Sequence, residues 1–280
     1  MVTRVLRLFR KTLQVPIKEQ IGNVKLWLPP EHLLPIYKNK YPLYDSFLPV
    51  LAKRLPERST VIDVGANIGD TCMSMISANS SLNFICVEPD NKFFQYLKFN
   101  TRKIPLGQIK LHKVLVTTTL DSYKLVGKGG TKSMVVAKKS GMKSNTLDNI
   151  CDNLKTDSII SLIKSDVDGY DFDVLLSGKS IISKYQPLVF SEFSFIDSRS
   201  IDKYLELVKY MISEDYVTAF LFKNTGEFDR LISLNKLEEF LRKKVDANNQ
   251  FSTVSYFDIL FSASNFQKIA EIAVSDFRNL

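Results

Sequence analysis

Val61-Ile62-Asp63-Val64-Gly65-Ala66-Asn67-Ile68-Gly69-Asp70 is the stretch that decides the fold of this chain. It begins as a β-branched, apolar run, which is typical of a buried strand, and it breaks into a Gly-x-x-x-Gly turn. A helix-length segment follows, and a second apolar run at residues 84–87 ends in Glu88-Pro89. A strand, a glycine turn, a helix and a second strand with a carboxylate at its end predict one half of a nucleotide-binding α/β fold.

The glycine turn and the carboxylate together predict an adenosine-type ligand. Glycines let the backbone approach a ligand closely, and the N-terminus of the next helix offers free N–H groups. Glu88 stands where a carboxylate accepts hydrogen bonds from both hydroxyls of a ribose. We therefore expect a cofactor that contains adenosine.

The identity of the cofactor depends on a missing glycine. A dinucleotide-binding turn has the pattern Gly-x-Gly-x-x-Gly, whose middle glycine makes room for a pyrophosphate. Asn67 takes that position here, and we expect Asp63 to point into the same crevice and repel a pyrophosphate. S-adenosylmethionine carries an ammonium and a sulfonium group and no phosphate, so the pattern favours it. The alternative is that Asp63 only caps the turn, as Asp does in many loops.

Ligands of doubly wound sheets bind beyond the carboxyl ends of the strands, so we expect the cofactor there. The first two strands provide the turn and the ribose carboxylate, and the third ends against the adenine. The predicted cofactor-binding residues are Asp63, Gly65, Ala66, Asn67, Gly69, Asp70, Glu88, Pro89, Val116, Thr117 and Asp166.

Four motifs in this order resemble the FkbM-type methyltransferases. They lie at residues 63–69, 87–89, 146–148 and 163–169, and the resemblance runs from about residue 41 to about residue 193. These are class I, S-adenosylmethionine-dependent enzymes, mostly assigned to O-methylation. The resemblance implies a hydroxyl acceptor, on a sugar in polysaccharide or glycolipid biosynthesis. Two positions depart from the family, which usually has an apolar residue at Ser165 and Glu at Asp168.

Alternating strand-like and helix-like segments predict an α/β fold with a doubly wound, mostly parallel, seven-stranded Rossmann-like sheet and helices on both faces. The expected core strands are residues 61–64, 84–87, 109–116, 158–164 and 187–193, and the helices are 71–78, 91–100, 146–153, 172–182 and 201–213. Residues 216–222 and 254–262 match the antiparallel sixth and seventh strands of a class I methyltransferase, with a helix at 234–244 between them. We divide the chain into an N-terminal cover segment, residues 1–55, and a methyltransferase domain, residues 56–280.

The ends of the fourth and fifth strands hold the candidate catalytic residues, Lys164, Asp166, Asp168 and Glu192. Methyl transfer is an in-line displacement, and a base that takes the proton helps because a sugar hydroxyl is a poor nucleophile. Asp166 is the first candidate for this base, whereas Asp168 with Gly169 also suits a plain turn before a helix. Lys164 would keep a carboxylate ionised or orient the acceptor.

A metal ion and a histidine mechanism are two further possibilities. Asp166, Asp168 and Glu192 could offer oxygen ligands to magnesium, but such clusters also arise from the fold, and we assign no metal ligand. The two histidines are His32, in a proline-rich loop that could cover the site, and His112, in an alternating strand. We do not expect a mechanism based on histidine.

The composition predicts a globular protein of a reducing cytoplasm. Apolar residues make up 45% and charged residues 24% of the chain, and Cys72, Cys86 and Cys151 form no Cys-x-x-Cys pair. No apolar run reaches the roughly 18 residues of a membrane span. The basic, amphipathic residues 1–13 lack signal-peptide features. We interpret them as a helix on the protein's own core, with peripheral contact at the inner face of the membrane as the alternative.

The net charge of +8 bears on the partner. The chain has a local excess of lysine at Lys124, Lys128, Lys132, Lys138, Lys139 and Lys143. We expect no nucleic-acid partner, because such proteins combine basic charge with aromatics or a recognisable module. A phosphate-bearing acceptor or a solvated loop explains these lysines equally well.

The alternatives to a methyltransferase are an NAD-dependent oxidoreductase, which Asn67 disfavours, and a non-catalytic cofactor-binding module that docks to glycan enzymes.

Overall fold

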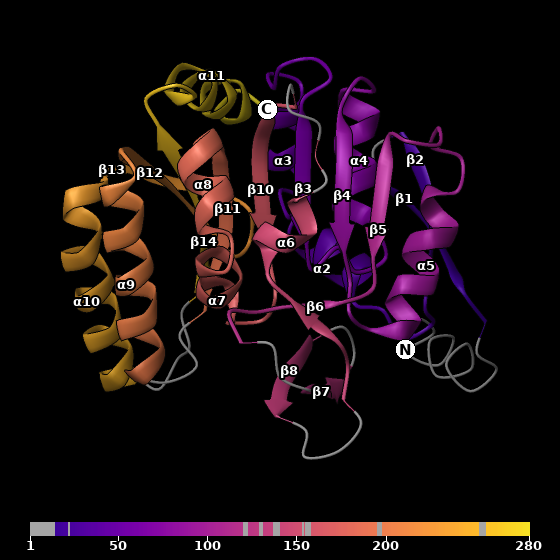
Figure 1. Cartoon of the computed structure of the whole chain (residues 1–280), viewed down its shortest axis with the longest axis horizontal. Helices are drawn as coiled ribbons and strands as arrows, with labels where there is room; N and C mark the ends of the chain where they lie inside the picture. The colour runs from indigo at the N-terminus through magenta and orange to yellow at the C-terminus, as the bar shows by residue number, and fades with distance from the viewer. Residues whose placement is uncertain are drawn as a thin grey trace.

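A mostly parallel sheet of eight strands forms the centre of the computed structural model, and helices pack on both of its faces (Figure 1). The structure describes all residues except 1–14, 22, 120–122, 129–130, 137–140, 153, 155–157, 195–197 and 252–255. The amphipathic segment at residues 1–13, Lys138 and Lys139 therefore lie outside the described residues.

Two adjacent strands at the middle of the sheet, β3 (Thr60–Val64) and β10 (Ile160–Ser165), determine where a ligand can bind. The order across the sheet is β13, β12, β14, β11, β10, β3, β4, β5. From β3 the chain continues to β4 (Asn83–Val87) and β5 (Ile109–His112) on one side, and from β10 to β11 (Leu188–Ser194) on the other. All these pairs are parallel. The order thus reverses between β3 and β10, which is the point where ligands of doubly wound sheets bind.

The far edge of the sheet differs from the prediction in two ways. β14 (Tyr256–Ala263) is antiparallel to both β11 and β12 (Tyr216–Lys223), so β12 runs parallel to β11, although both last strands were expected to be antiparallel. An eighth strand, β13 (Phe228–Ser233), pairs with β12. The sequence did not predict β13 because an edge strand needs no apolar run, and Asp229-Arg230-Leu231 is exposed.

The predicted helices are present, but one of them is divided in two and the helix predicted at residues 234–244 continues to Phe251. The helices after the cover are α4 (Asp70–Ala78), α5 (Asn91–Thr101), α6 (Leu147–Cys151), α7 (Asp171–Leu176), α8 (Lys179–Tyr185), α9 (Ser198–Ser213), α10 (Leu234–Phe251) and α11 (Gln267–Arg278). A single helix was expected where α7 and α8 lie. Gly178 separates them, and a Cβ on Gly178 would lie 2.8 Å from the side chain of Leu147 in α6.

The predicted third strand is also divided. β5 ends at His112, and β6 (Leu115–Val116) pairs with β9 (Ser144–Asn145) in a separate two-stranded sheet. β7 (Tyr123–Lys128) and β8 (Thr131–Val136) form a hairpin that projects from the carboxyl end of the main sheet (Figure 1). Leu115 and Val116 of β6 line the same pocket as Val87, the last residue of β4.

Side chains that alternate along the central strands build two hydrophobic clusters, one on each face of the sheet. Ile62 and Val64 of β3 belong to one cluster, with the inner faces of α6 to α10, whereas Val61 belongs to the other, with α3, α4 and α11. Both faces are buried, which explains why the strand reads as a continuous apolar run rather than an alternating one.

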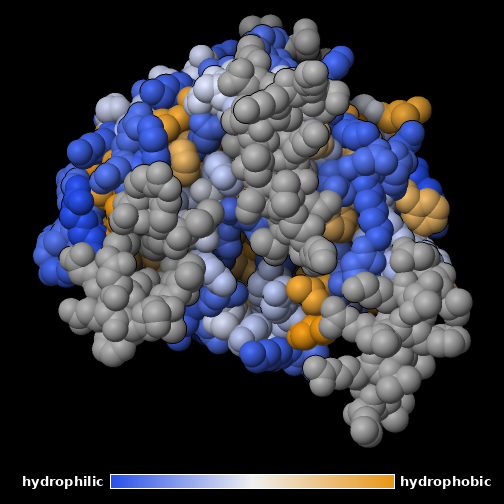
Figure 2. Space-filling view, turned by 90° about the horizontal axis from the view of Figure 1, so that it is seen from below, coloured by the Kyte–Doolittle hydropathy of each residue, from blue (hydrophilic) through white to orange (hydrophobic). Residues whose placement is uncertain are grey.

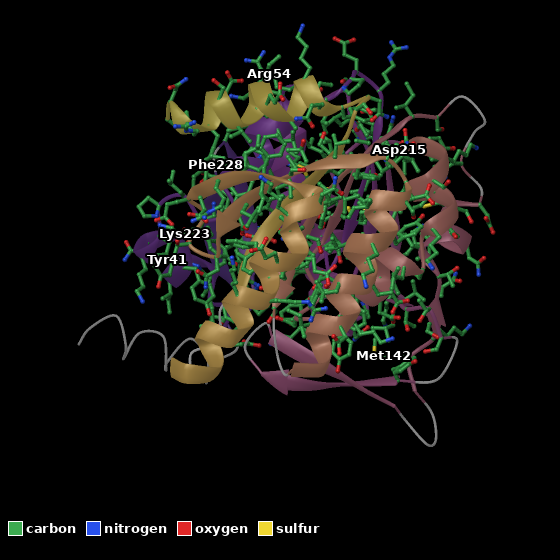
Figure 3. The ribbon with its side chains drawn as sticks, turned by 90° about the vertical axis from the view of Figure 1, so that its left-hand side faces the viewer. Tyr41, Arg54, Met142, Asp215, Lys223 and Phe228 are labelled. Atoms are coloured by element: carbon green, nitrogen blue, oxygen red, sulfur yellow. The ribbon has the colours of Figure 1, made fainter. Side chains whose placement is uncertain are left out.

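The N-terminal cover consists of β1 (Ile17–Ile21), β2 (Val24–Leu28), α2 (Leu34–Lys40) and α3 (Phe47–Ala52). Leu26, Phe47 and Leu51 are buried in the same hydrophobic cluster as the core strands. Figure 3 shows Arg54, just after α3, beside α11, where it pairs with Asp276 at 2.6 Å. The cover thus shares its core with the sheet; a boundary at residue 55 remains a prediction.

Among the coloured residues of Figure 2, which views the molecule from below, most are hydrophilic, and the hydrophobic ones lie in small separate groups. Among the helices that the structure describes, none has the length and apolar composition needed to cross a membrane.

Gly65, directly after β3, packs against the loop that follows β10. Its φ is +75°, and a Cβ there would lie 2.0 Å from the carbonyl oxygen of Asp166. Gly107 has a similar φ of +92°, but a Cβ there would meet no atom within 4 Å. We predict that Gly65→Ala lowers the free energy of unfolding by at least about 2 kcal/mol more than Gly107→Ala, because only Gly65→Ala adds a backbone clash to the unfavourable φ. Urea denaturation of both variants measures this difference, and equal losses would contradict the packing.

Candidate active site

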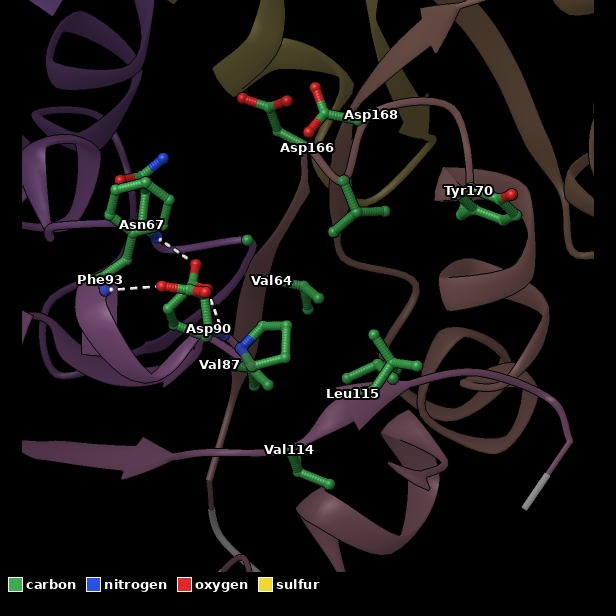
Figure 4. A pocket seen from close by; sticks show the side chains of 15 residues that line it. Val64, Asn67, Val87, Asp90, Phe93, Val114, Leu115, Asp166, Asp168 and Tyr170 are labelled. Carbon is green, nitrogen blue, oxygen red and sulfur yellow. Dashed lines mark hydrogen bonds between the residues drawn. The ribbon is translucent and has the colours of Figure 1, made fainter. Parts of the chain in front are cut away.

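A cavity opens beyond the carboxyl ends of β3, β4 and β10, where the strand order reverses (Figure 4). The empty space that it encloses, part of which is open solvent, is about 690 Å³. Seven predicted site residues line it: Gly65, Asn67, Glu88, Pro89, Val116, Asp166 and Asp168. The other predicted site residues do not line it: Asp63, Ala66, Gly69, Asp70, Thr117, Lys164 and Glu192.

The turn after β3 is held in a left-handed conformation at three residues, Gly65, Asn67 and Gly69. The N–H groups of Gly65 and Ala66 both donate to the carbonyl of Val87 at the end of β4, at 3.0 Å. A Cβ on Gly69 would lie 2.9 Å from the side chain of Leu97 in α5. The two glycines thus allow the turn to approach the protein's own loops and helices, and the turn is fixed on several sides.

Glu88 closes the turn from the side of β4. Its two carboxylate oxygens accept hydrogen bonds from the backbone N–H of Asn67 at 2.9 Å and of Asp90 at 2.7 Å. Burial raises the pKa of Glu88 to about 7, although the two N–H donors act in the opposite direction. A carboxylate oxygen can accept two hydrogen bonds, so Glu88 retains acceptor capacity for a ligand in the cavity.

An apolar wall lies next to Glu88. Asp90 caps α5 by accepting hydrogen bonds from the N–H groups of Lys92 and Phe93, at 2.9 and 3.0 Å, and so fixes Phe93 at the cavity (Figure 4). Val116 lines the cavity, whereas Thr117 is 1% exposed. The N–H of Thr117 pairs with the carbonyl of Asn145 instead.

Sequence reasoning missed eight lining residues. They are Val64, Val87, Asp90, Phe93, Val114, Leu115, Val167 and Tyr170. Most of them directly follow or precede a predicted residue, so the ends of the strands indicated the region. Phe93 had a clearer signal, because Asp90 is a good N-cap and places the third helical residue over the end of the strand.

A buried ion pair lies beneath the turn. Nζ of Lys164 is 3.1 Å from Oδ1 of Asp63 and donates to the carbonyl of Gly65 at 3.1 Å. Lys164 is 3% exposed and Asp63 is 0% exposed. Burial acts to lower the pKa of Lys164, but the charges of Asp63 and Asp166 outweigh it and raise this pKa above the ordinary value. Lys164 is therefore positively charged and compensates the buried carboxylate.

The orientation predicted for Asp63 differs from the one observed. The sequence indicated a carboxylate that points into the crevice, but Asp63 is absent from the cavity wall. Its second oxygen accepts a hydrogen bond from the Thr71 hydroxyl at 2.9 Å, so both oxygens face groups beneath the turn. The physical reason is the positive charge of Lys164 on the neighbouring strand, which a reading of β3 alone does not include. Binding of a cofactor by Asp63 stays a prediction.

Asp166 is the predicted catalytic residue with the most exposed position at the cavity. Its side chain is 49% exposed, and one oxygen lies 3.8 Å from Nζ of Lys164. Buried Asp171 fixes the loop that carries Asp166, because it accepts hydrogen bonds from the Ser165 hydroxyl at 2.6 Å and the Val167 N–H at 3.2 Å. Ser165, which departs from the family pattern, therefore has a definite partner in this chain.

Further carboxyl groups surround Asp166, and its charge raises the pKa of each. Burial, followed by the charges of Asp166, Asp171 and Asp258, raises the pKa of Glu192 in β11 to about 10. Burial, with Asp70 and Asp166, raises the pKa of Asp45 in the cover to about 7. Asp258 lies opposite Glu192 in the register of β14 with β11, and burial raises its pKa well above the ordinary value.

Neither Asp45 nor Asp258 was among the predicted site residues. Asp258 had a signal, since it is the one charged residue within the apolar run of β14, Tyr256–Ala263. Asp45 has a left-handed backbone with a φ of 54°, which its sequence context does not reveal.

Within the described parts of the chain, no group of three or more His, Cys, Asp or Glu side chains is arranged to hold a metal ion. The magnesium alternative for Asp166, Asp168 and Glu192 therefore has no support from the geometry.

Comparison with known families gives one match of substantial extent. The methyltransferase FkbM domain matches residues 63–218, which is more than half of the chain. No curated protein matches.

Solved structures show weaker likeness. The FkbM methyltransferase of Methylobacillus flagellatus KT is 21% identical, over 57% of this chain and 39% of that chain, with a TM-score of 0.41. A TehB-like, SAM-dependent methyltransferase of Corynebacterium glutamicum is 9% identical, over 82% of this chain and 100% of that chain, with a TM-score of 0.42. A fibrillarin/Nop5p complex gives 11% identity, 75% and 74% coverage and a TM-score of 0.44. The chain thus spans well under half of the length of the FkbM structure.

The raised pKa of Glu192 predicts how stability depends on pH. The folded protein keeps this proton up to a pH of about 10, whereas the unfolded chain loses it near the ordinary pKa of 4.5. The contribution of Glu192 to stability is therefore full below about pH 4.5 and falls as the pH rises toward 10. We predict that Glu192→Gln is more stable than the wild type at pH 8, by a margin that shrinks toward pH 5.

Urea denaturation at several pH values from 5 to 8 measures this margin. The exposed Glu206, replaced by Gln, serves as the control and is expected to leave the pH dependence unchanged. If Glu192→Gln is no more stable than the wild type, or if its advantage in stability grows toward pH 5, the raised pKa of Glu192 is contradicted.

Proposed function

The chain belongs to the family of methyltransferases with an FkbM domain, and we propose that it transfers the methyl group of S-adenosylmethionine to a hydroxyl group. The observation that carries the proposal is the position of Glu88. It lines the cavity at the end of β4, is held by two backbone N–H groups and retains acceptor capacity. Such a carboxylate can accept hydrogen bonds from both hydroxyls of a ribose, and the wall that contains Phe93 and Val116 suits an adenine.

The charge of the cavity favours S-adenosylmethionine over a dinucleotide. Among the lining residues that the structure describes, Glu88, Asp90, Asp166 and Asp168 are acidic and none is basic. The backbone N–H of Asn67, which lies where a pyrophosphate would need a donor, is bound to Glu88. A cavity of this charge repels a pyrophosphate and attracts an ammonium and a sulfonium.

Asp166 is the best candidate for the base that takes the hydroxyl proton. When bound, the cofactor would supply a methyl group that is already activated by its sulfonium. Lys164 is buried and is committed to Asp63, and Glu192, with a pKa of about 10, is protonated at neutral pH. Asp166 would accept the proton as the acceptor oxygen bonds to the methyl carbon and the carbon–sulfur bond breaks.

The proposed acceptor is a hydroxyl-bearing small molecule or glycan of polysaccharide or glycolipid biosynthesis. Nucleic acid is not proposed, because an acidic cavity disfavours a phosphate backbone. The proposed location is the cytoplasm, with contact at the inner face of the membrane through residues 1–13; the three free, buried cysteines are consistent with a reducing compartment.

Calorimetric titration with S-adenosylmethionine and with NAD tests the choice of cofactor. We predict binding of S-adenosylmethionine and none of NAD. Glu88→Gln should lower the affinity for S-adenosylmethionine by about tenfold or more, since it removes charge-assisted hydrogen bonds to the ribose. Binding of NAD but not of S-adenosylmethionine would favour the oxidoreductase alternative. If the protein does not bind S-adenosylmethionine, the proposal is overturned.

Transfer of a labelled methyl group to a panel of sugar acceptors tests catalysis. We predict that Asp166→Asn keeps the affinity for S-adenosylmethionine but lowers the turnover by about a hundredfold or more, because it loses the base. Asp152→Asn, an exposed site after α6, is the control with unchanged turnover. Unchanged turnover in Asp166→Asn would remove Asp166 as the base. Binding of the cofactor without transfer to any acceptor would favour the non-catalytic module.

A further inference from the structure

The N-terminal cover lies outside the matched family domain, residues 63–218, yet it is joined directly to the turn after β3. Asn100 of α5, which is 7% exposed, makes the first connection. Its Oδ1 accepts a hydrogen bond from the Trp27 N–H at 2.9 Å, and its Nδ2 donates to the Trp27 carbonyl at 3.0 Å. The same Nδ2 donates to the carbonyl of Ile68 at 2.9 Å. One side chain thus ties β2 to the residue that follows Asn67.

His32 makes the second connection. Its Nδ1 accepts a hydrogen bond from the Leu34 N–H at 3.2 Å, so the ring proton is assigned to Nε2. Nε2 lies 3.1 Å from Oδ1 of Asn67 and therefore donates to it. The ring also packs edge-on against Phe93, with centroids 5.9 Å apart, and so contacts a second residue of the cavity wall.

Asn67 carries the contact with His32 to the cavity. Its backbone has a φ of 49°, an unfavourable conformation for a residue with a side chain, although Asn tolerates it better than most. In that conformation its N–H donates to Glu88 at 2.9 Å. A hydrogen bond from His32 that fixes the side-chain amide of Asn67 therefore also fixes its backbone N–H, which holds the carboxylate of Glu88.

We infer that His32 is a positioning residue of the cofactor site, acting through Asn67 on Glu88. The inference rests on the proposed function, because it takes the ligand of Glu88 to be the ribose of S-adenosylmethionine. A turn that is fixed before the ligand arrives loses less conformational freedom on binding, so the contact raises the affinity for the cofactor. The reactive groups around Asp166 are not part of this chain of contacts, so the turnover at saturating cofactor does not depend on it.

Two substitutions of His32 separate its two hydrogen bonds. In His32→Asn the amide oxygen can replace Nδ1 as the acceptor for Leu34 but cannot reach Asn67. In His32→Gln the longer amide can replace the Nε2 donor to Asn67 but leaves Leu34 without its acceptor. A role confined to folding the loop would make His32→Gln the more harmful change, whereas a role through Asn67 makes His32→Asn the more harmful one.

We predict that His32→Asn lowers the affinity for S-adenosylmethionine, measured by calorimetry, about threefold to tenfold, as expected for one lost hydrogen bond. His32→Gln should bind S-adenosylmethionine with the affinity of the wild type. The KM for the cofactor rises in His32→Asn, and kcat at saturation is unchanged. Lys92→Gln is the matched control, because it breaks the exposed ion pair between Lys92 of α5 and Glu31, the residue before His32, without touching the turn. This control should keep the wild-type affinity.

A double-mutant cycle with Asn67→Gly checks the route, since glycine adopts the left-handed backbone but offers no acceptor to His32. In that background His32→Asn should have no further effect on the affinity. An equal effect in both backgrounds, wild-type affinity in His32→Asn, or a greater loss in His32→Gln would each overturn the inference. Failure of the wild type to bind S-adenosylmethionine would instead overturn the proposed function.

Discussion

The ion pair between Lys164 and Asp63 is the interaction on which the rest of the site depends. The two residues stand opposite each other on β10 and β3, the strands between which the order of the sheet reverses. Lys164 also holds the carbonyl of Gly65, so the charge that neutralises Asp63 fixes the first residue of the turn. In comparable buried pairs, removal of one partner costs about 3–5 kcal/mol, because it leaves an uncompensated charge. The pair thus connects the two halves of the sheet at the point where ligands of doubly wound sheets bind.

The turn above this pair is constrained on several sides by groups of the protein. The loop after β10 contacts Gly65 so closely that no side chain fits between them, and the end of β4 binds Gly65 and Ala66. Glu88 accepts the N–H of Asn67. Because Lys164 is hidden beneath the turn, the described lining of the cavity contains acidic residues and no basic one. The protein is basic as a whole, but its cavity is acidic, and this local charge bears on the choice of cofactor.

The central part of this fold could be predicted from the sequence because its signals are local. The turn at residues 65–69 follows a β-branched run directly, and Glu88 ends the next run, so their positions at one edge of the sheet follow from the order of elements. Partners from distant segments could not be predicted in the same way. The orientation of Asp63 depends on Lys164 of another strand, and the contact of His32 with Asn67 depends on how the cover folds back. β13 was missed because an exposed edge strand lacks the apolar pattern that marks the core strands.

The central claim is that the cavity beyond β3, β4 and β10 binds S-adenosylmethionine with Glu88 at the ribose. A crystal structure of the protein with S-adenosylhomocysteine, the product of methyl transfer, tests this claim most directly. The account predicts both ribose hydroxyls within hydrogen-bond distance of Glu88, the adenine against Phe93 and Val116, and the sulfur on the side of Asp166. A nucleoside bound elsewhere, or a ribose without contact to Glu88, would contradict it.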